Sequence, residues 1–184
     1  MKKSFLLFFS VLSIALLMGS CGESQKTSGS GEAESKSEEV QGVKYENKDF
    51  GYSVVLPEGF AQQNDDAEME ASRGGKLFLS QGCMIDVTAT KMNYMGSMTP
   101  EKSAEQCLEF AKVGYDKPEN ELFEAKMLDD VSFVVKAKDD FGLRASYQTQ
   151  KNGNKYMIDV TYPADKKEQF DKDVDALIKS FEVK

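Results

Sequence analysis

The chain contains no histidine among its 184 residues. Histidine carries protons near neutral pH and is a frequent zinc ligand. Its absence excludes Ser-His-Asp and Cys-His catalytic groups, histidine-ligated zinc, and acid–base catalysis by imidazole. Any chemistry that this protein performs must come from other side chains.

Carboxylate catalysis needs no histidine but requires two acidic side chains that face one substrate. Adjacent acids occur at Asp65–Asp66, Asp129–Asp130 and Asp139–Asp140, and each pair is typical of a turn. The D-x-D-x-D-G pattern of a calcium-binding loop is absent. We therefore predict that the protein is not an enzyme and holds no cofactor, with a carboxylate hydrolase as a further alternative.

Basic residues are in the minority, with 23 Lys and Arg against 31 Asp and Glu, for a net charge of -8. An acidic chain repels nucleic-acid phosphates and anionic lipid headgroups. We therefore expect no nucleic-acid partner. The acidic excess favours solubility, cationic partners or loosely held divalent cations.

The first twenty residues have the pattern of a cleaved export signal. Lys2 and Lys3 precede an uncharged apolar run over residues 5–18. As a helix this run would span roughly 21 Å, which is short of the ~30 Å hydrocarbon core of a bilayer. A signal peptide over residues 1–20 therefore fits better than a permanent membrane helix.

The run ends in Leu17-Met18-Gly19-Ser20-Cys21-Gly22, which resembles the lipobox of bacterial type II signal peptides. Met18 departs from the usual pattern, in which leucine stands three residues before the cysteine. The resemblance implies cleavage before Cys21 and a diacylglyceryl group on its thiol. Two or three acyl chains make such anchoring effectively permanent. The alternative is ordinary secretion with a chance cysteine at the boundary.

The composition of residues 21–42 predicts a flexible linker, because serine, glycine and glutamate dominate there and aromatic residues are absent. Such a segment has a root-mean-square span of roughly 25 Å, which would hold a domain just off the bilayer. Residues 43–184 have the usual length of one domain with one core.

Hydrophobic periodicity and turn signals predict the elements of this domain. Two strands flank a turn within residues 45–56, and a hairpin joins 68–72 to 76–80 around Arg73-Gly74-Gly75. A half-buried strand follows at 83–90. Thr99 and Pro100 open a helix that ends near Gly114.

The remaining elements are three strands and a final helix, with an ambiguous segment around Leu122. The strands are expected at 131–138, 141–150 and 155–162, and Asn152-Gly153 is a strong hairpin signal. Asp165 and Glu168 predict a capping box for the last helix. The pattern predicts an α+β domain built on an antiparallel sheet.

Several of these segments together resemble the PsbP-like domains, which are αβα sandwiches around an antiparallel sheet. The resemblance rests on Phe50-Gly51-Tyr52-Ser53-Val54, Leu56-Pro57-Glu58-Gly59-Phe60, Tyr162-Pro163 and Lys179-Ser180-Phe181. It spans most of residues 43–184 and implies an accessory or assembly role at a membrane rather than catalysis. Known members associate with photosystem II and influence manganese and calcium retention. This chain has no histidine to match a histidine ligand, so no binding residue is carried over.

Cys83 and Cys107 form an even pair once Cys21 is lipidated. An exported protein meets an oxidising compartment, so a disulfide between a strand and a helix is one interpretation. Two buried free thiols, which behave as small hydrophobic groups, are the other.

Met92, Met95 and Met98 form an M-x-x-M-x-x-M run, which resembles the thioether motifs of exported copper-handling proteins. Soft sulfur ligands select Cu(I). Methionine also fills irregular gaps in protein cores, and the chain has nine methionines. Cu(I) binding is therefore an alternative function, and we assign no metal ligand.

Taken together, these patterns predict a lipid-anchored, non-enzymatic protein of the bacterial cell envelope, with its domain facing the periplasm or the cell surface. We expect it to bind another envelope protein or a small ligand. Aromatic residues at the ends of predicted elements could line a partner groove or belong to the core: Phe50, Tyr52, Phe60 and Tyr94.

The lipid anchor can be tested by the substitution Cys21→Ala. Because the thiol is the only atom in the motif that takes the lipid, this variant should move from the membrane fraction to the soluble fraction. Cys83→Ala serves as the matched control and should stay with the membranes. A Cys21→Ala protein that remains in the membrane fraction would rule out the lipid anchor.

Overall fold

The computed structural model describes residues 42–63 and 71–184, all within one compact unit that spans residues 38–184. The expected signal peptide, Cys21, nearly all of the linker and the Asp65–Asp66 pair lie outside the described residues. None of the described helices is both long and apolar enough to cross a membrane.

A small antiparallel sheet is formed by β1 (Gly42–Asn47), β2 (Tyr52–Pro57) and β10 (Glu182–Val183), with β2 in the centre. The expected early strand pair is therefore confirmed. The C-terminal residues extend this sheet, and the Lys184 backbone N–H donates to the Gly51 carbonyl at 2.8 Å.

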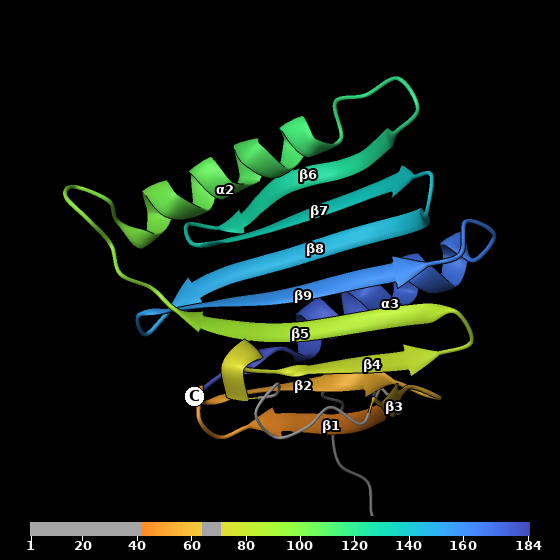
Figure 1. Cartoon of the computed structure of the whole chain (residues 1–184), viewed down its shortest axis with the longest axis horizontal. Helices are drawn as coiled ribbons and strands as arrows, with labels where there is room; N and C mark the ends of the chain where they lie inside the picture. Colours follow the sequence, from red (N-terminus) through yellow and green to blue (C-terminus); the bar gives the residue numbers. More distant parts are fainter. Residues whose placement is uncertain (1–41, 64–70) are drawn as a thin grey trace, which may run out of the picture. The chain divides into compact units, whose positions relative to one another are not determined.

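A large antiparallel sheet contains the other described strands, in the order β3-β4-β5-β9-β8-β7-β6 (Figure 1). The strands are β3 (Ala61–Gln62), β4 (Lys76–Ser80), β5 (Cys83–Lys91), β6 (Glu121–Asp129), β7 (Ser132–Asp139), β8 (Gly142–Lys151) and β9 (Asn154–Tyr162).

The Asn152-Gly153 turn joins β8 to β9. Both of its residues have positive φ, at 53° and 73°, as a tight hairpin turn requires.

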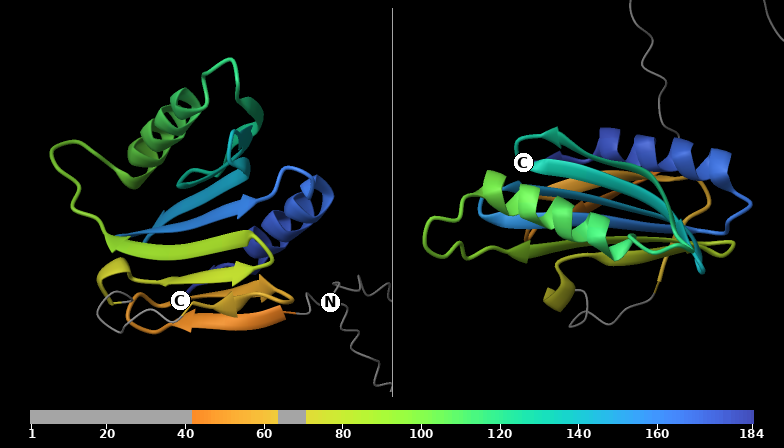
Figure 2. Two further views of the ribbon diagram at one scale, coloured as in Figure 1. Left: turned by 45° about the vertical axis from the view of Figure 1, so that its right-hand side comes forward. Right: turned by 90° about the horizontal axis from the view of Figure 1, so that it is seen from above.

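The helices α2 (Pro100–Gly114) and α3 (Lys167–Ser180) lie on opposite faces of the large sheet, as the right-hand view of Figure 2 shows. α3 and the small sheet cover one face, and α2 covers β6, β7 and part of β8 on the other. The described residues thus form the expected α+β domain, an antiparallel sheet flanked by helices.

The main core lies between the large sheet, α3 and the small sheet. Phe170, Val174 and Leu177 of α3 recur at helical spacing and are at most 2% exposed. The ring of Tyr52 lies 5.5 Å from that of Tyr156 and 5.6 Å from that of Phe181. Full burial of one such side chain contributes about 1.5–3 kcal/mol, so this core fixes the arrangement of both sheets and α3.

The prediction of a hairpin around Arg73-Gly74-Gly75 is wrong. Residues 71–73 are helical, and β4 pairs with β3 and β5. A Cβ atom on Gly75 would lie 1.8 Å from the Val87 carbonyl oxygen. The glycine therefore permits close approach of two backbones, a need that is easily mistaken for a turn signal.

The structure resolves one ambiguous segment and corrects one further expectation. The ambiguous segment around Leu122 is strand β6, an edge strand with register shifts against β7. α3 begins after Lys166, and no side chain caps its N-terminus, so the capping box from Asp165 to Glu168 is wrong. The sequence of β6 was ambiguous because an exposed, irregular edge strand shows little alternation of apolar and polar residues.

Candidate functional site

Helix α2 forms where its sequence predicts it. Pro100 occupies the first turn, and the Thr99 side chain accepts a hydrogen bond from the Lys102 backbone N–H at 3.4 Å. Its inner face is held by Leu108, which packs against Phe133 and Val135 of β7. This contact fixes the helix on the sheet and determines which of its residues face solvent.

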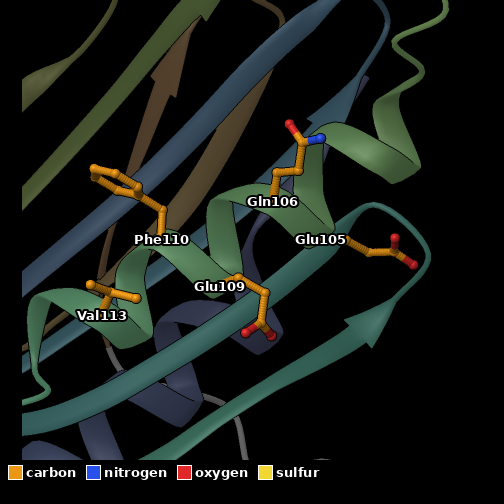
Figure 3. A pocket seen from close by; sticks show the side chains of 5 residues that line it. All are labelled: Glu105, Gln106, Glu109, Phe110 and Val113. Carbon is orange, nitrogen blue, oxygen red and sulfur yellow. The ribbon is translucent and has the colours of Figure 1, made fainter.

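The outer face of α2 exposes two large apolar side chains, Phe110 at 83% and Val113 at 69%. They lie three residues apart and project from the same side of the helix (Figure 3). We call the surface that surrounds them the α2 outer face. It borders a shallow depression of about 500 Å³ that is lined by Glu105, Gln106, Glu109, Phe110 and Val113.

Acidic side chains border this apolar patch. The carboxylates of Glu105 and Glu109 point away from Phe110 in Figure 3, and both residues are exposed. Glu109 forms an ion pair with Lys112 at 2.6 Å. An apolar centre with a charged rim is the usual composition of a protein-binding surface.

The sheet face on the α2 side carries a second polar feature. Asp86 of β5 stands directly opposite Asp159 of β9. The sequence Met-Ile-Asp-Val-Thr occurs twice, at 84–88 and 157–161, and the two copies pair with each other around these aspartates. Sequence reasoning missed this pair, although the repeated pentapeptide was a signal that could have revealed it.

The two aspartates have different surroundings. Asp86 forms an ion pair with Arg73. Burial and the nearby Asp86 charge raise the pKa of Asp159 above its ordinary value, while Ser146 and Arg144 oppose the rise. The pair resembles the facing carboxylates of a hydrolase only in part, because Arg73 holds one member.

For Cys83 and Cys107 the sequence leaves both a disulfide and two free thiols open. Both thiols are free. Cys83 belongs to the core on the α3 side of the large sheet, and Cys107 packs on the α2 side. The sheet lies between them, so the free-thiol interpretation describes this structure.

The methionine run lies before α2. Met95 is 84% exposed, whereas Met92 and Met98 are half-buried. The three side chains thus do not share one environment, and Met95 fills no core gap. Within residues 42–63 and 71–184, three or more His, Cys, Asp and Glu side chains nowhere gather to hold a metal ion.

The other candidates from the sequence lie in turns or in the core. The Val131 N–H donates to the Asp129 carboxylate at 2.9 Å and the Phe141 N–H to that of Asp139 at 2.8 Å, which confirms both as turn residues. Of the two interpretations of the aromatic residues, burial fits better than a partner groove, because Tyr52 and Phe60 are buried and Phe50 and Tyr94 are half-buried.

Comparison with known proteins identifies the fold. No protein-family model and no curated protein sequence matches the chain. The solution structure of cyanobacterial PsbP (CyanoP) from Synechocystis sp. PCC 6803 is similar, with a TM-score of 0.53 and 16% identity. This match covers 77% of the chain and 92% of CyanoP. The expected PsbP-like fold is thereby confirmed.

A crystal structure from Bacteroides thetaiotaomicron VPI-5482 also matches, with a TM-score of 0.46 and 15% identity. The match covers 78% of this chain and 49% of that protein.

The raised pKa of Asp159 has a consequence for stability. An acid with a higher pKa in the folded state binds its proton more tightly there, so folding stability falls as pH rises from the ordinary Asp value through the folded value. Asp159→Asn removes this penalty. We expect its Tm to exceed that of the wild type by roughly 2–5 °C at pH 7, with the gap narrowing toward pH 4.

Asp140→Asn is the matched control, because Asp140 lies in an exposed turn. Thermal unfolding of both variants between pH 4 and pH 7 checks the prediction. A lower Tm for Asp159→Asn at pH 7, or a gap that does not change with pH, would contradict it.

Proposed function

We propose that this chain is a lipid-anchored accessory protein of the bacterial cell envelope, which uses the α2 outer face to dock onto another envelope protein. The proposal assigns no catalytic step to the chain. Cys21 would supply the anchor, residues 22–41 the tether, and the PsbP-like domain the binding surface.

Three observations support an accessory role. The first residues resemble a lipoprotein signal, and the fold is similar to that of CyanoP. The chain also has no histidine, which removes the commonest catalytic acid and base. PsbP-like domains are associated with accessory roles at membranes, and we extend that role to this chain as part of the proposal.

The observation that carries the docking proposal is the exposure of Phe110 and Val113. A soluble helix normally turns such side chains toward the core. Here Leu108 satisfies the core contact, and the two exposed side chains contribute nothing to it. Exposed aromatic side chains at the centre of a polar rim are frequent anchors in protein interfaces.

The charge of the rim defines the partner. Glu105 and Glu109 border the apolar centre. Lys112 pairs with Glu109, but Glu105 and the acidic chain as a whole keep the negative excess. A partner surface with an apolar ridge between Lys or Arg side chains would complement this face. A second copy of the chain would bring like charges together, so we assign the face to a different protein.

Photo-cross-linking in the bacterium that produces the protein tests this assignment. Benzoylphenylalanine at position 110 should give one adduct of defined mass with an envelope protein, because the reactive ring would lie within the interface. Val113→Lys in the same chain should reduce the adduct at least 5-fold, since it places a charge in the apolar centre.

Phe141 provides the matched control position, because it is 79% exposed but lies outside α2. Benzoylphenylalanine at 141 should not give the same adduct. An identical adduct from both positions, or a product at position 110 with twice the mass of the chain, would overturn the docking proposal.

A further inference from the structure

A groove runs between the inner side of α2 and the large sheet, and it shares Gln106 and Phe110 with the depression on the α2 outer face. It measures about 400 Å³, within the range of small-ligand sites. The helix contributes Ser103, Gln106, Cys107, Phe110 and Ala111, and the sheet contributes Phe133, Ser146 and Gln148.

Gln148 lies in the wall of this groove that the sheet forms. The residue is 5% exposed, and its side-chain amide nitrogen has no hydrogen-bond partner among the described residues. The neighbouring Gln150 is different. Its Oε1 accepts from the Tyr94 hydroxyl at 2.7 Å, and its Nε2 donates to Ser103 Oγ at 3.2 Å.

An unpaired buried donor is unfavourable, so most native structures avoid it. The fold satisfies the amide of Gln150 and leaves the amide nitrogen of Gln148, a residue that lines the groove, without a partner among the described residues. This arrangement is expected where a ligand supplies the missing acceptor atom. A residue that served packing alone at this position would be apolar.

The surroundings restrict the chemistry of such a ligand. Cys107, Phe110 and Phe133 offer an apolar surface, and the Gln148 amide requires an oxygen acceptor. Asp159 stands opposite Ser146 at the edge of the groove, and Glu105 and Glu109 lie on the same helix. Negative charge nearby disfavours a carboxylate ligand.

We propose that this groove binds a small neutral compound that joins a carbonyl or amide oxygen to an aromatic or branched apolar group. The oxygen accepts a hydrogen bond from Gln148 Nε2, and the apolar group lies against Phe110 and Phe133. The site does not depend on the docking proposal, because ligand binding requires no partner protein.

Nuclear magnetic resonance of the ¹⁵N-glutamine-labelled full chain in lipid nanodiscs tests the site with N-benzylacetamide as the probe. The Gln148 side-chain signal is identified as the one that is missing from the Gln148→Met variant. N-benzylacetamide should shift this signal with a Kd on the order of millimolar, as expected for a ligand of its size.

Gln148→Met keeps the length of the side chain and removes the donor. It should weaken N-benzylacetamide binding by about 5–10-fold, which is the loss of affinity expected when one hydrogen bond is removed. The same variant should raise the Tm by roughly 2–4 °C, since an unpaired buried group is removed. Gln106→Met, at an exposed position in the same groove, should change binding less than 2-fold.

Two further probes separate the contributions. Butylbenzene has the ring without the oxygen, and 3-phenylpropionate carries a carboxylate. Both should bind more weakly than N-benzylacetamide. Equal binding of butylbenzene, tighter binding of 3-phenylpropionate, or N-benzylacetamide binding that survives Gln148→Met within 2-fold would each overturn the proposal.

Discussion

The burial of one face of the large sheet is the constraint on which the rest of this domain depends. Strands β5, β8 and β9 alternate so that apolar side chains meet α3 and the small sheet, while polar ones face the side of α2. Lys136 of β7 is an exception, a charged side chain that is buried at 7% exposure. It lies on the α3 side, where burial lowers its pKa, but Asp175 and Glu124 more than offset this and raise it.

The other face of the sheet has different requirements. α2 rests on it mainly through Leu108, Phe133 and Val135, a much smaller cluster than the main core. The polar residues of β8 and β9 need no apolar cover, so one helix suffices there. The position of α2 at the edge of the sheet leaves both an exposed outer face and a groove beneath it, and both proposals arise from this placement.

The sequence predicts the regular part of this fold well, because periodicity and local turn chemistry determine it. Thr99-Pro100 and Asn152-Gly153 act through their own backbone geometry, so the helix and hairpin they mark could be identified. The role of Gly75 could not be identified from the sequence, because it depends on the close approach of a distant strand. Strand β6 could not be identified either, because its pairing at the sheet edge also depends on another strand. The facing aspartates and the unpaired Gln148 amide likewise depend on register between strands. Exposure of Phe110 follows from where α2 docks, which periodicity alone does not give.

Hydrogen–deuterium exchange of residues 100–114 tests the proposed docking of a partner onto α2 most directly. Hydrogen–deuterium exchange compares the protein in its native membranes with the purified full chain in nanodiscs. We predict slower exchange in residues 100–114 in native membranes, where the proposed partner would cover Phe110 and Val113, and unchanged exchange in residues 167–180. Equal exchange of residues 100–114 in both preparations, or protection confined to residues 167–180, would contradict it.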